Sequence, residues 1–159
     1  MRLHIVCQRL APFVVALLLT TPISGAYAFS GINETPTDIN ALSQLEQRAE
    51  HASAREQCFL YTELVEGYTQ VAGKQMADGD MDQASATLKR IQNYATRIHM
   101  SLARDTKRLK NAEKMMHQAA RSLGEYLHHV SIEDKAVVES TLKQLEKVND
   151  ELLAQVFAH

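Results

Sequence analysis

The feature that most constrains the fold of this chain is a run of apolar and small residues between Met81 and Val130. They recur at alternating intervals of four and three: Met81, Ala84, Leu88, Ile91, Ala95, Ile98, Leu102, Leu109, Ala112, Met116, Ala119, Leu123, Tyr126 and Val130. Only Asp105 interrupts the series. A mean spacing of 3.5 residues keeps one side of a helix facing a partner helix. The pattern therefore predicts one long helix over residues 80–130 with coiled-coil-like packing.

Two further amphipathic helices are predicted, over residues 38–77 and 132–157. The turn Asp78-Gly79-Asp80 separates the first from the central helix, because Gly79 allows a left-handed helix end and Asp80 can cap the next helix. Three helices joined by short turns must run antiparallel. We therefore expect an all-α fold, an elongated antiparallel three-helix bundle or helical hairpin.

The first 28 residues have the three-part layout of a secretory signal peptide. Arg2 and Arg9 precede an apolar run over residues 10–19, and a segment of small residues ends at Ala28. The run is shorter than the roughly 20 residues that a membrane-spanning helix needs, so we expect cleavage after Ala28 rather than an anchor. This predicts export by the general secretory route to the periplasm or exterior of a bacterial cell. A flexible lead-in over residues 29–37 and a helical domain over 38–159 would follow.

Charge and cysteine content restrict the function classes. Without Arg2 and Arg9 the chain carries 15 Lys and Arg against 19 Asp and Glu, a balance that is not typical of nucleic-acid-binding proteins. Cys58 is the one cysteine after residue 28, so the exported chain cannot form an internal disulfide. Two roles stay open for this thiol: a buried apolar side chain, or a disulfide between two chains.

One predicted hairpin resembles a known repeat. Its residues Tyr68, Ala72, Gly79-Asp80, Ala84 and Leu88 are spaced as in the helix-turn-helix unit of tetratricopeptide repeats. No second copy follows, and Thr96 stands where the repeat has its terminal proline. The resemblance implies a tight pair of helices and is not extended to the function of that family.

Basic side chains are concentrated on the predicted central helix. In the register set by Leu102, eight of them fall at outward positions: Lys89, Arg90, Arg97, Arg104, Lys107, Lys110, Lys114 and Arg121. Arg108 flanks the seam. On one straight helix they would form a basic stripe of about 48 Å, able to bind an anionic lipid, glycan or other polyanion. Pairing with acidic residues of the flanking helices and a simple solvated face are the alternatives.

Asp105 would occupy a d position on the seam, where the three helices are expected to overlap. A polar residue at such a position usually selects a register or partner at a cost in stability. We therefore expect Asp105 to contribute core specificity.

Motifs that carry chemistry are missing or incomplete. Glu125 and His128 have the Glu-x-x-His spacing of di-iron bundles, but such a site needs a second motif and two further Glu residues. Met115, Met116 and His117 have the residue types of a copper site, yet Met116 belongs to the seam. No Gly-rich phosphate loop or nucleophile elbow occurs in the sequence. We expect no enzymatic activity, catalytic residue, metal or cofactor.

These observations predict an exported, non-enzymatic helical interaction or scaffold protein that acts through helix–helix contacts. Its partner would be another protein or a second copy of the chain. Binding of an anionic envelope component through the basic stripe is one alternative, and a metal- or haem-binding helical bundle is another. We expect neither nucleic-acid binding nor a membrane-spanning form after cleavage.

Overall fold

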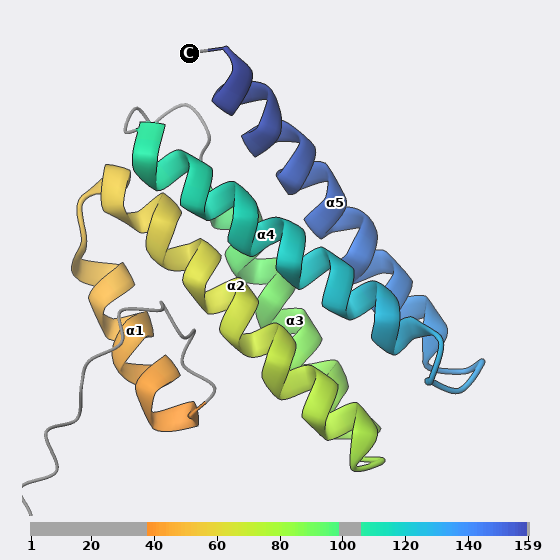
Figure 1. The fold of residues 1–159 in the computed structure, drawn as a ribbon. Helices are drawn as coiled ribbons and strands as arrows, with labels where there is room; N and C mark the ends of the chain where they lie inside the picture. Colours follow the sequence, from red (N-terminus) through yellow and green to blue (C-terminus); the bar gives the residue numbers. More distant parts are fainter. Residues whose placement is uncertain (1–37, 99–105, 159) are drawn as a thin grey trace, which may run out of the picture. The chain divides into compact units, whose positions relative to one another are not determined.

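Five helices account for most of the residues that the computed structural model describes, which are 38–98 and 106–158 (Figure 1). The helices are α1 (Ile39–His51), α2 (Ala54–Ala77), α3 (Met81–Arg97), α4 (Thr106–Leu127) and α5 (Lys135–Phe157). No strand occurs within these two ranges, so the prediction of an all-α fold is confirmed. The predicted signal peptide and the lead-in lie outside the described residues.

Helices α2 to α5 pack as a four-helix bundle in which each helix has two neighbours. α2 lies against α3 and α4, and α5 lies against the same two helices. The backbones of α3 and α4 are described throughout, and no Cα atom of one comes within 8 Å of a Cα atom of the other, so these helices occupy opposite corners. α2 and α4 run parallel, because Glu56 meets Arg108 near their starts and Gly73 meets Tyr126 near their ends. α1 packs along α2 (Figure 1).

The single helix predicted over residues 80–130 is corrected to two helices. α3 ends before its C-cap residue Ile98, whose backbone is extended (φ −72°, ψ 100°). Nε2 of Gln144 on α5 donates to the carbonyl oxygen of Gln92 on α3 (2.9 Å). If residues 80–130 formed one straight helix with residues 132–157 folded back along it, Gln144 would lie beside the second half of that helix, about 40 Å from Gln92. The spacing pattern could not reveal the break, because two helices that fold against the same core bury the same positions. The predicted three-helix bundle is therefore replaced by four bundle helices and α1.

The first predicted helix, over residues 38–77, is also divided. Ala52 and Ser53 are extended, with ψ of 158° and 151°. Nε2 of Gln57 in the first turn of α2 donates to a carbonyl oxygen in the last turn of α1 (3.0 Å), and the Ser53 hydroxyl donates to Oε2 of Glu56 (3.2 Å). Ser-x-x-Glu is a helix-start signal that an apolar stripe running through both segments conceals.

The turn between α2 and α3 matches its prediction. Gly79 has a positive φ of 79°, a conformation that costs a glycine little. The carboxylate of Asp80 accepts a hydrogen bond from the backbone N–H of Gln83 (3.3 Å), which caps α3. The turn between α4 and α5 is longer than predicted, and within it the Ser131 hydroxyl donates to Oδ2 of Asp134 (2.7 Å).

The core is built from the positions that the spacing pattern predicted. The buried members of the series are Ala84, Leu88, Ile91, Ala95, Ile98, Leu109, Ala112, Met116, Ala119 and Leu123. Side chains such as Leu64 of α2 and Leu145 of α5 complete this core and are fully buried. Each fully buried side chain of this size contributes about 1.5–3 kcal/mol, so apolar packing is the main source of stability.

Candidate functional site

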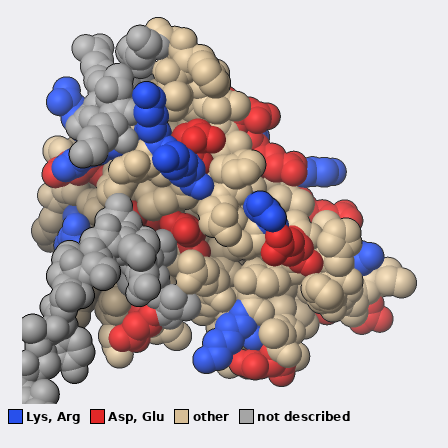
Figure 2. Space-filling model, in the orientation of Figure 1, with Lys and Arg blue, Asp and Glu red and all other residues tan. Residues whose placement is uncertain are grey.

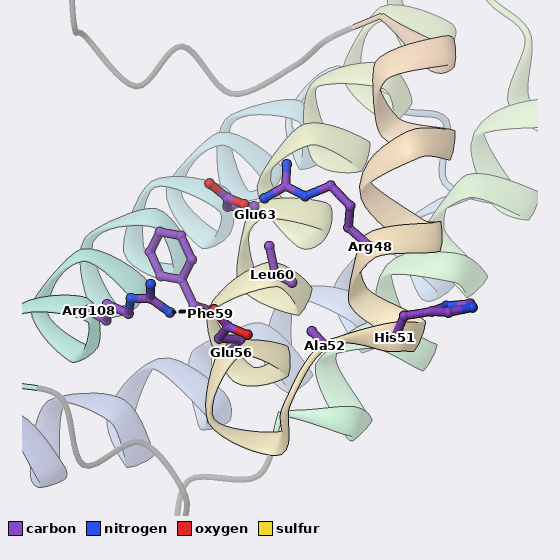
Figure 3. Close-up of a pocket in the computed structure, with 8 residues that line it drawn as sticks. All are labelled: Arg48, His51, Ala52, Glu56, Phe59, Leu60, Glu63 and Arg108. Carbon is purple, nitrogen blue, oxygen red and sulfur yellow. Dashed lines mark ion pairs between the residues drawn. The ribbon is translucent and has the colours of Figure 1, made fainter.

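A polar hollow opens beside α2, between α1 and the start of α4 (Figure 3). Its volume is about 410 Å³, which is within the range of pockets that hold small molecules. Eight residues line it and define it: Arg48, His51, Ala52, Glu56, Phe59, Leu60, Glu63 and Arg108. Because it combines charges of both signs with an aromatic ring, the polar hollow is the candidate binding site.

Helix geometry brings the lining residues together from three helices. The α2 members share one helix face, since they follow at intervals of three, one and three: Glu56, Phe59, Leu60 and Glu63. The extended residues 52–53 let α1 fold back along α2, which brings Arg48 to one side of that face. Arg108, in the first turn of α4, stands on the other side. Figure 3 shows the Arg48 side chain directed toward Glu63, whereas His51 points away from both.

Only part of the charge in the polar hollow is neutralised by ion pairing. Nη1 of Arg108 lies 3.6 Å from Oε1 of Glu56. Burial raises the pKa of the Glu63 carboxyl group above its ordinary value; Glu66 adds to this rise, while Arg48 and Arg108 oppose it. Among the residues that the structure describes, the side chain of neither Glu63 nor Arg48 forms a hydrogen bond or a close ion pair.

A cluster of four polar side chains fixes α1, and with it one wall of the polar hollow. Oε1 of Glu46 on α1 accepts hydrogen bonds from the hydroxyls of Tyr68 (2.7 Å) and Tyr94 (2.5 Å) and from Nη2 of Arg90 (2.7 Å). The two tyrosine rings stack with centroids 6.0 Å apart, and the Arg90 guanidinium lies 4.7 Å from the Tyr68 centroid. We name these four residues the Glu46 cluster. It ties α1 to both α2 and α3 through hydrogen bonds to a carboxylate, which are stronger than neutral ones.

The Glu46 cluster raises the pKa values of its two tyrosines. Burial raises the pKa of Tyr68 to about 12; the hydrogen bond to Glu46 and the charge of Glu46 add to the rise, and Arg90 opposes it. Burial and Glu46 also raise the pKa of Tyr94. Both hydroxyls are therefore donors at neutral pH, which suits this cluster to positioning α1 rather than to proton transfer.

The basic residues predicted to form one stripe are divided between two helices. Those of α3 are Lys89, Arg90 and Arg97, and those of α4 with described side chains are Arg108, Lys110, Lys114 and Arg121. Since α3 and α4 occupy opposite corners of the bundle, the single stripe does not form: it required one continuous helix. On the face drawn in Figure 2, basic and acidic side chains are interspersed.

Several of these basic side chains have partners within the chain. Arg90 pairs with Glu46, and Nε of Arg121 lies 3.3 Å from Oε1 of Glu125. The Arg97 guanidinium lies 6.0 Å from the centroid of the Tyr61 ring. The Arg90–Glu46 contact is a pair with an acidic residue of another helix, as one alternative expects, and a binding role for the remaining basic residues stays a prediction.

Three predicted site residues fall where the structure gives no side-chain description. Arg104 and Asp105 lie outside the described residues, and so does the side chain of Lys107. The role of Asp105 in core specificity therefore stays a prediction.

Cys58 is buried, with 3% of its surface exposed. Burial raises the pKa of its thiol to about 11, and the thiolate is the reactive form of cysteine. The position favours the role of a small apolar side chain over that of a disulfide between two chains.

A second hollow, of about 310 Å³, lies between α4 and α5. His117, Glu146 and Asp150 are among the residues that line it. Nowhere in the described part of the chain are three His, Cys, Asp or Glu side chains grouped as a metal ion would require. Within the same residues, no helix is both long and apolar enough to cross a membrane.

The polar hollow was not among the sites predicted from the sequence. Arg48 and Arg108 are distant in the sequence, and only the folding of α1 and α4 against α2 brings them to one place. A local signal did exist in the helical spacing of Glu56, Phe59 and Glu63. Comparison of the chain with models of protein families, with curated protein sequences and with solved structures found no match.

Proposed function

We propose that this chain is an exported, non-enzymatic binding protein that recognises its partner at the polar hollow. One observation carries the proposal: Glu63 and Arg48 face the same hollow, and within the described residues the side chain of neither forms a hydrogen bond or close ion pair. Glu63 is partly buried, whereas Arg48 is exposed, so the cost of lacking a close partner falls on the Glu63 carboxylate. A bound partner that supplies a positive charge to Glu63 and an anionic group to the accessible Arg48 would offset this cost.

The architecture of the polar hollow supports the predicted use of helix contacts. Its floor is one face of α2, and its walls come from α1 and from the start of α4. Such a surface accepts a group that projects from a partner helix, or a separate molecule of small size. The extracytoplasmic location rests on the predicted signal peptide.

Catalysis has less support than binding. The Cys58 thiol is buried and protonated at neutral pH. The hydroxyls of Tyr68 and Tyr94 are engaged as donors to Glu46. These groups stabilise the fold and are not presented to a substrate in the polar hollow.

Two alternatives to this proposal remain. Binding of an anionic envelope component would use exposed side chains such as Lys89 or Lys110 on separate helices instead of one stripe. A metal-binding bundle lacks support from any group of three His, Cys, Asp or Glu side chains among the described residues, and haem binding stays a prediction.

Photo-crosslinking in living cells tests the proposal. A photoreactive phenylalanine analogue at Phe59, in the polar hollow, should capture a discrete adduct that the same analogue at Lys143 of α5 does not. Capture should weaken when Arg48→Gln is added. Identical adducts from both positions, or none from position 59, would contradict the proposal. Lipid or glycan captured from position 110 alone would favour the anion-binding alternative.

A further inference from the structure

We infer that the polar hollow recognises a small zwitterion, a molecule with one ammonium group and one carboxylate on a compact apolar frame. Glu63 would receive the ammonium and Arg48 the carboxylate. This inference rests on the proposed binding function and adds the chemical class of the ligand. A free α-amino acid and a short peptide are the two sources of this chemistry.

The balance of charges in the polar hollow carries the inference. Two guanidinium groups face two carboxylates, so the lining has no net charge when His51 is neutral. Glu56 and Arg108 are already paired at 3.6 Å. One acidic group, Glu63, and one basic group, Arg48, attract each other across the hollow, but in the described part of the chain neither forms a hydrogen bond or a close ion pair.

A ligand with a single charge cannot satisfy both groups. An anion would neutralise Arg48 but would be repelled by Glu63. A cation would neutralise Glu63 but would be repelled by Arg48. A zwitterion offers each group its opposite charge and leaves the hollow neutral. Such complementarity selects a partner by penalising the wrong charge as well as by attracting the right one.

The remaining lining suits the apolar part of a small ligand. Ala52, Phe59 and Leu60 contribute apolar surface to the polar hollow. The Arg108 guanidinium lies 6.0 Å from the centroid of the Phe59 ring. Apolar lining with a few fixed polar groups is typical of small-molecule sites.

The effect of the Glu63 carboxylate on the stability of the unliganded protein shows whether its role is in binding or in the fold. Its raised pKa means that burial disfavours the charged form. The folded protein therefore holds the proton more tightly than the unfolded chain, and stability falls as pH rises past the ordinary pKa of a glutamate. Glu63→Gln should consequently raise the urea midpoint at pH 7 while it weakens ligand binding. A merely structural carboxylate would lower the midpoint when removed.

Calorimetric titration of the exported full-length protein tests the inference. The probes are leucine and the dipeptide Leu-Leu, together with N-acetyl-leucine, which lacks the ammonium, and leucinamide, which lacks the carboxylate. At least one zwitterion should bind, and the single-charge analogues should bind at least tenfold more weakly. Preference for leucine or for Leu-Leu would identify the source as a free amino acid or a peptide.

Variants assign the two charges. Glu63→Gln should remove the preference for the ammonium, and Arg48→Gln should remove the preference for the carboxylate. Glu139→Gln, an exposed change on α5, should leave binding of the zwitterion unchanged.

Two results would overturn the inference. They are equal binding of a zwitterion and either analogue, and no binding of a zwitterion at millimolar concentration. If position 59 still captures a partner in cells, the binding function stands and only the ligand class falls. If neither experiment detects binding, both proposals fall.

Discussion

Replacing Gly73 with alanine should destabilise the bundle, although alanine is the better helix former. A Cβ atom at Gly73 would overlap the Cε2 and Cζ atoms of Tyr126 and lie 2.5 Å from its hydroxyl oxygen. Either the Tyr126 ring must leave its place or α2 and α4 must separate. Overpacking of this kind costs about 1–3 kcal/mol.

A matched variant isolates that cost. A glycine-to-alanine change in a helix interior gains about 0.5–1 kcal/mol from backbone entropy. At Gly124 on α4 the nearest atom to a new Cβ is Cδ2 of Leu142, at an ordinary contact distance of 3.9 Å. Gly124→Ala should therefore stabilise the protein by about 0.5–1 kcal/mol. Gly73→Ala should show a net loss of about 1 kcal/mol once the same gain is subtracted from the overpacking cost.

Urea unfolding followed by circular dichroism measures both changes, and 1 kcal/mol corresponds to about 3–5 °C in Tm for a domain of this size. In a Tyr126→Ala background the overlap is removed, so Gly73→Ala should become stabilising. If Gly73→Ala stabilises the otherwise unchanged protein as much as Gly124→Ala does, the close approach of α2 and α4 is refuted.

Three further predictions follow from contacts of single side chains. The free energy of unfolding should fall by about 1–2 kcal/mol as pH rises from about 10 to 12, because Tyr68 ionises near pH 10 in the unfolded chain and near pH 12 in the folded protein. Urea unfolding of Tyr68→Phe should show a shallower decline over this pH range. An equal decline in the variant would contradict the assignment to Tyr68. Asp80→Ala should cost about 1 kcal/mol by removing the cap of α3, whereas Asp78→Ala, measured in parallel by thermal unfolding, should change stability much less. Arg121→Ala breaks an exposed pair with Glu125 and should change the free energy of unfolding by less than about 0.5 kcal/mol; a larger loss would show that the pair contributes to packing.

The buried positions of the fold were predictable because burial follows from side-chain spacing alone. Leu88, Ile91 and Met116 were assigned to the seam and are fully buried. The division into α3 and α4 was not predictable from that spacing, since no Gly or Pro falls between residues 98 and 106 to mark it. The return of the chain after α3 brings α5 against α3, as the contact between Gln92 and Gln144 shows. Contacts between residues so distant in the sequence cannot be predicted from local spacing.

The division between α1 and α2 could have been predicted from a local sequence signal. Ser53 and Glu56 have the spacing of a helix start, but the apolar stripe continues on both sides and suggests an unbroken helix. The candidate site depends on this division, because a straight helix would carry Arg48 away from Glu63 instead of returning it alongside. Charge pairs across three helices depend on tertiary geometry, so sequence reasoning could name neither the hollow nor its ligand class.

Each half of the bundle closes between helices that follow one another in the chain, α2 with α3 and α4 with α5. Contacts between neighbours in sequence require little loop closure, so each pair can form early and quickly during folding. The pair α2–α3, however, can form before α4 and α5 have folded, and the apolar side chains on its inner face are then exposed to water. Leu64 of α2 and Leu88 of α3 are fully buried in the folded protein, and they belong to this first pair. A state in which only α2 and α3 have paired would expose both side chains, and exposed apolar surface of this kind favours aggregation or binding to a chaperone.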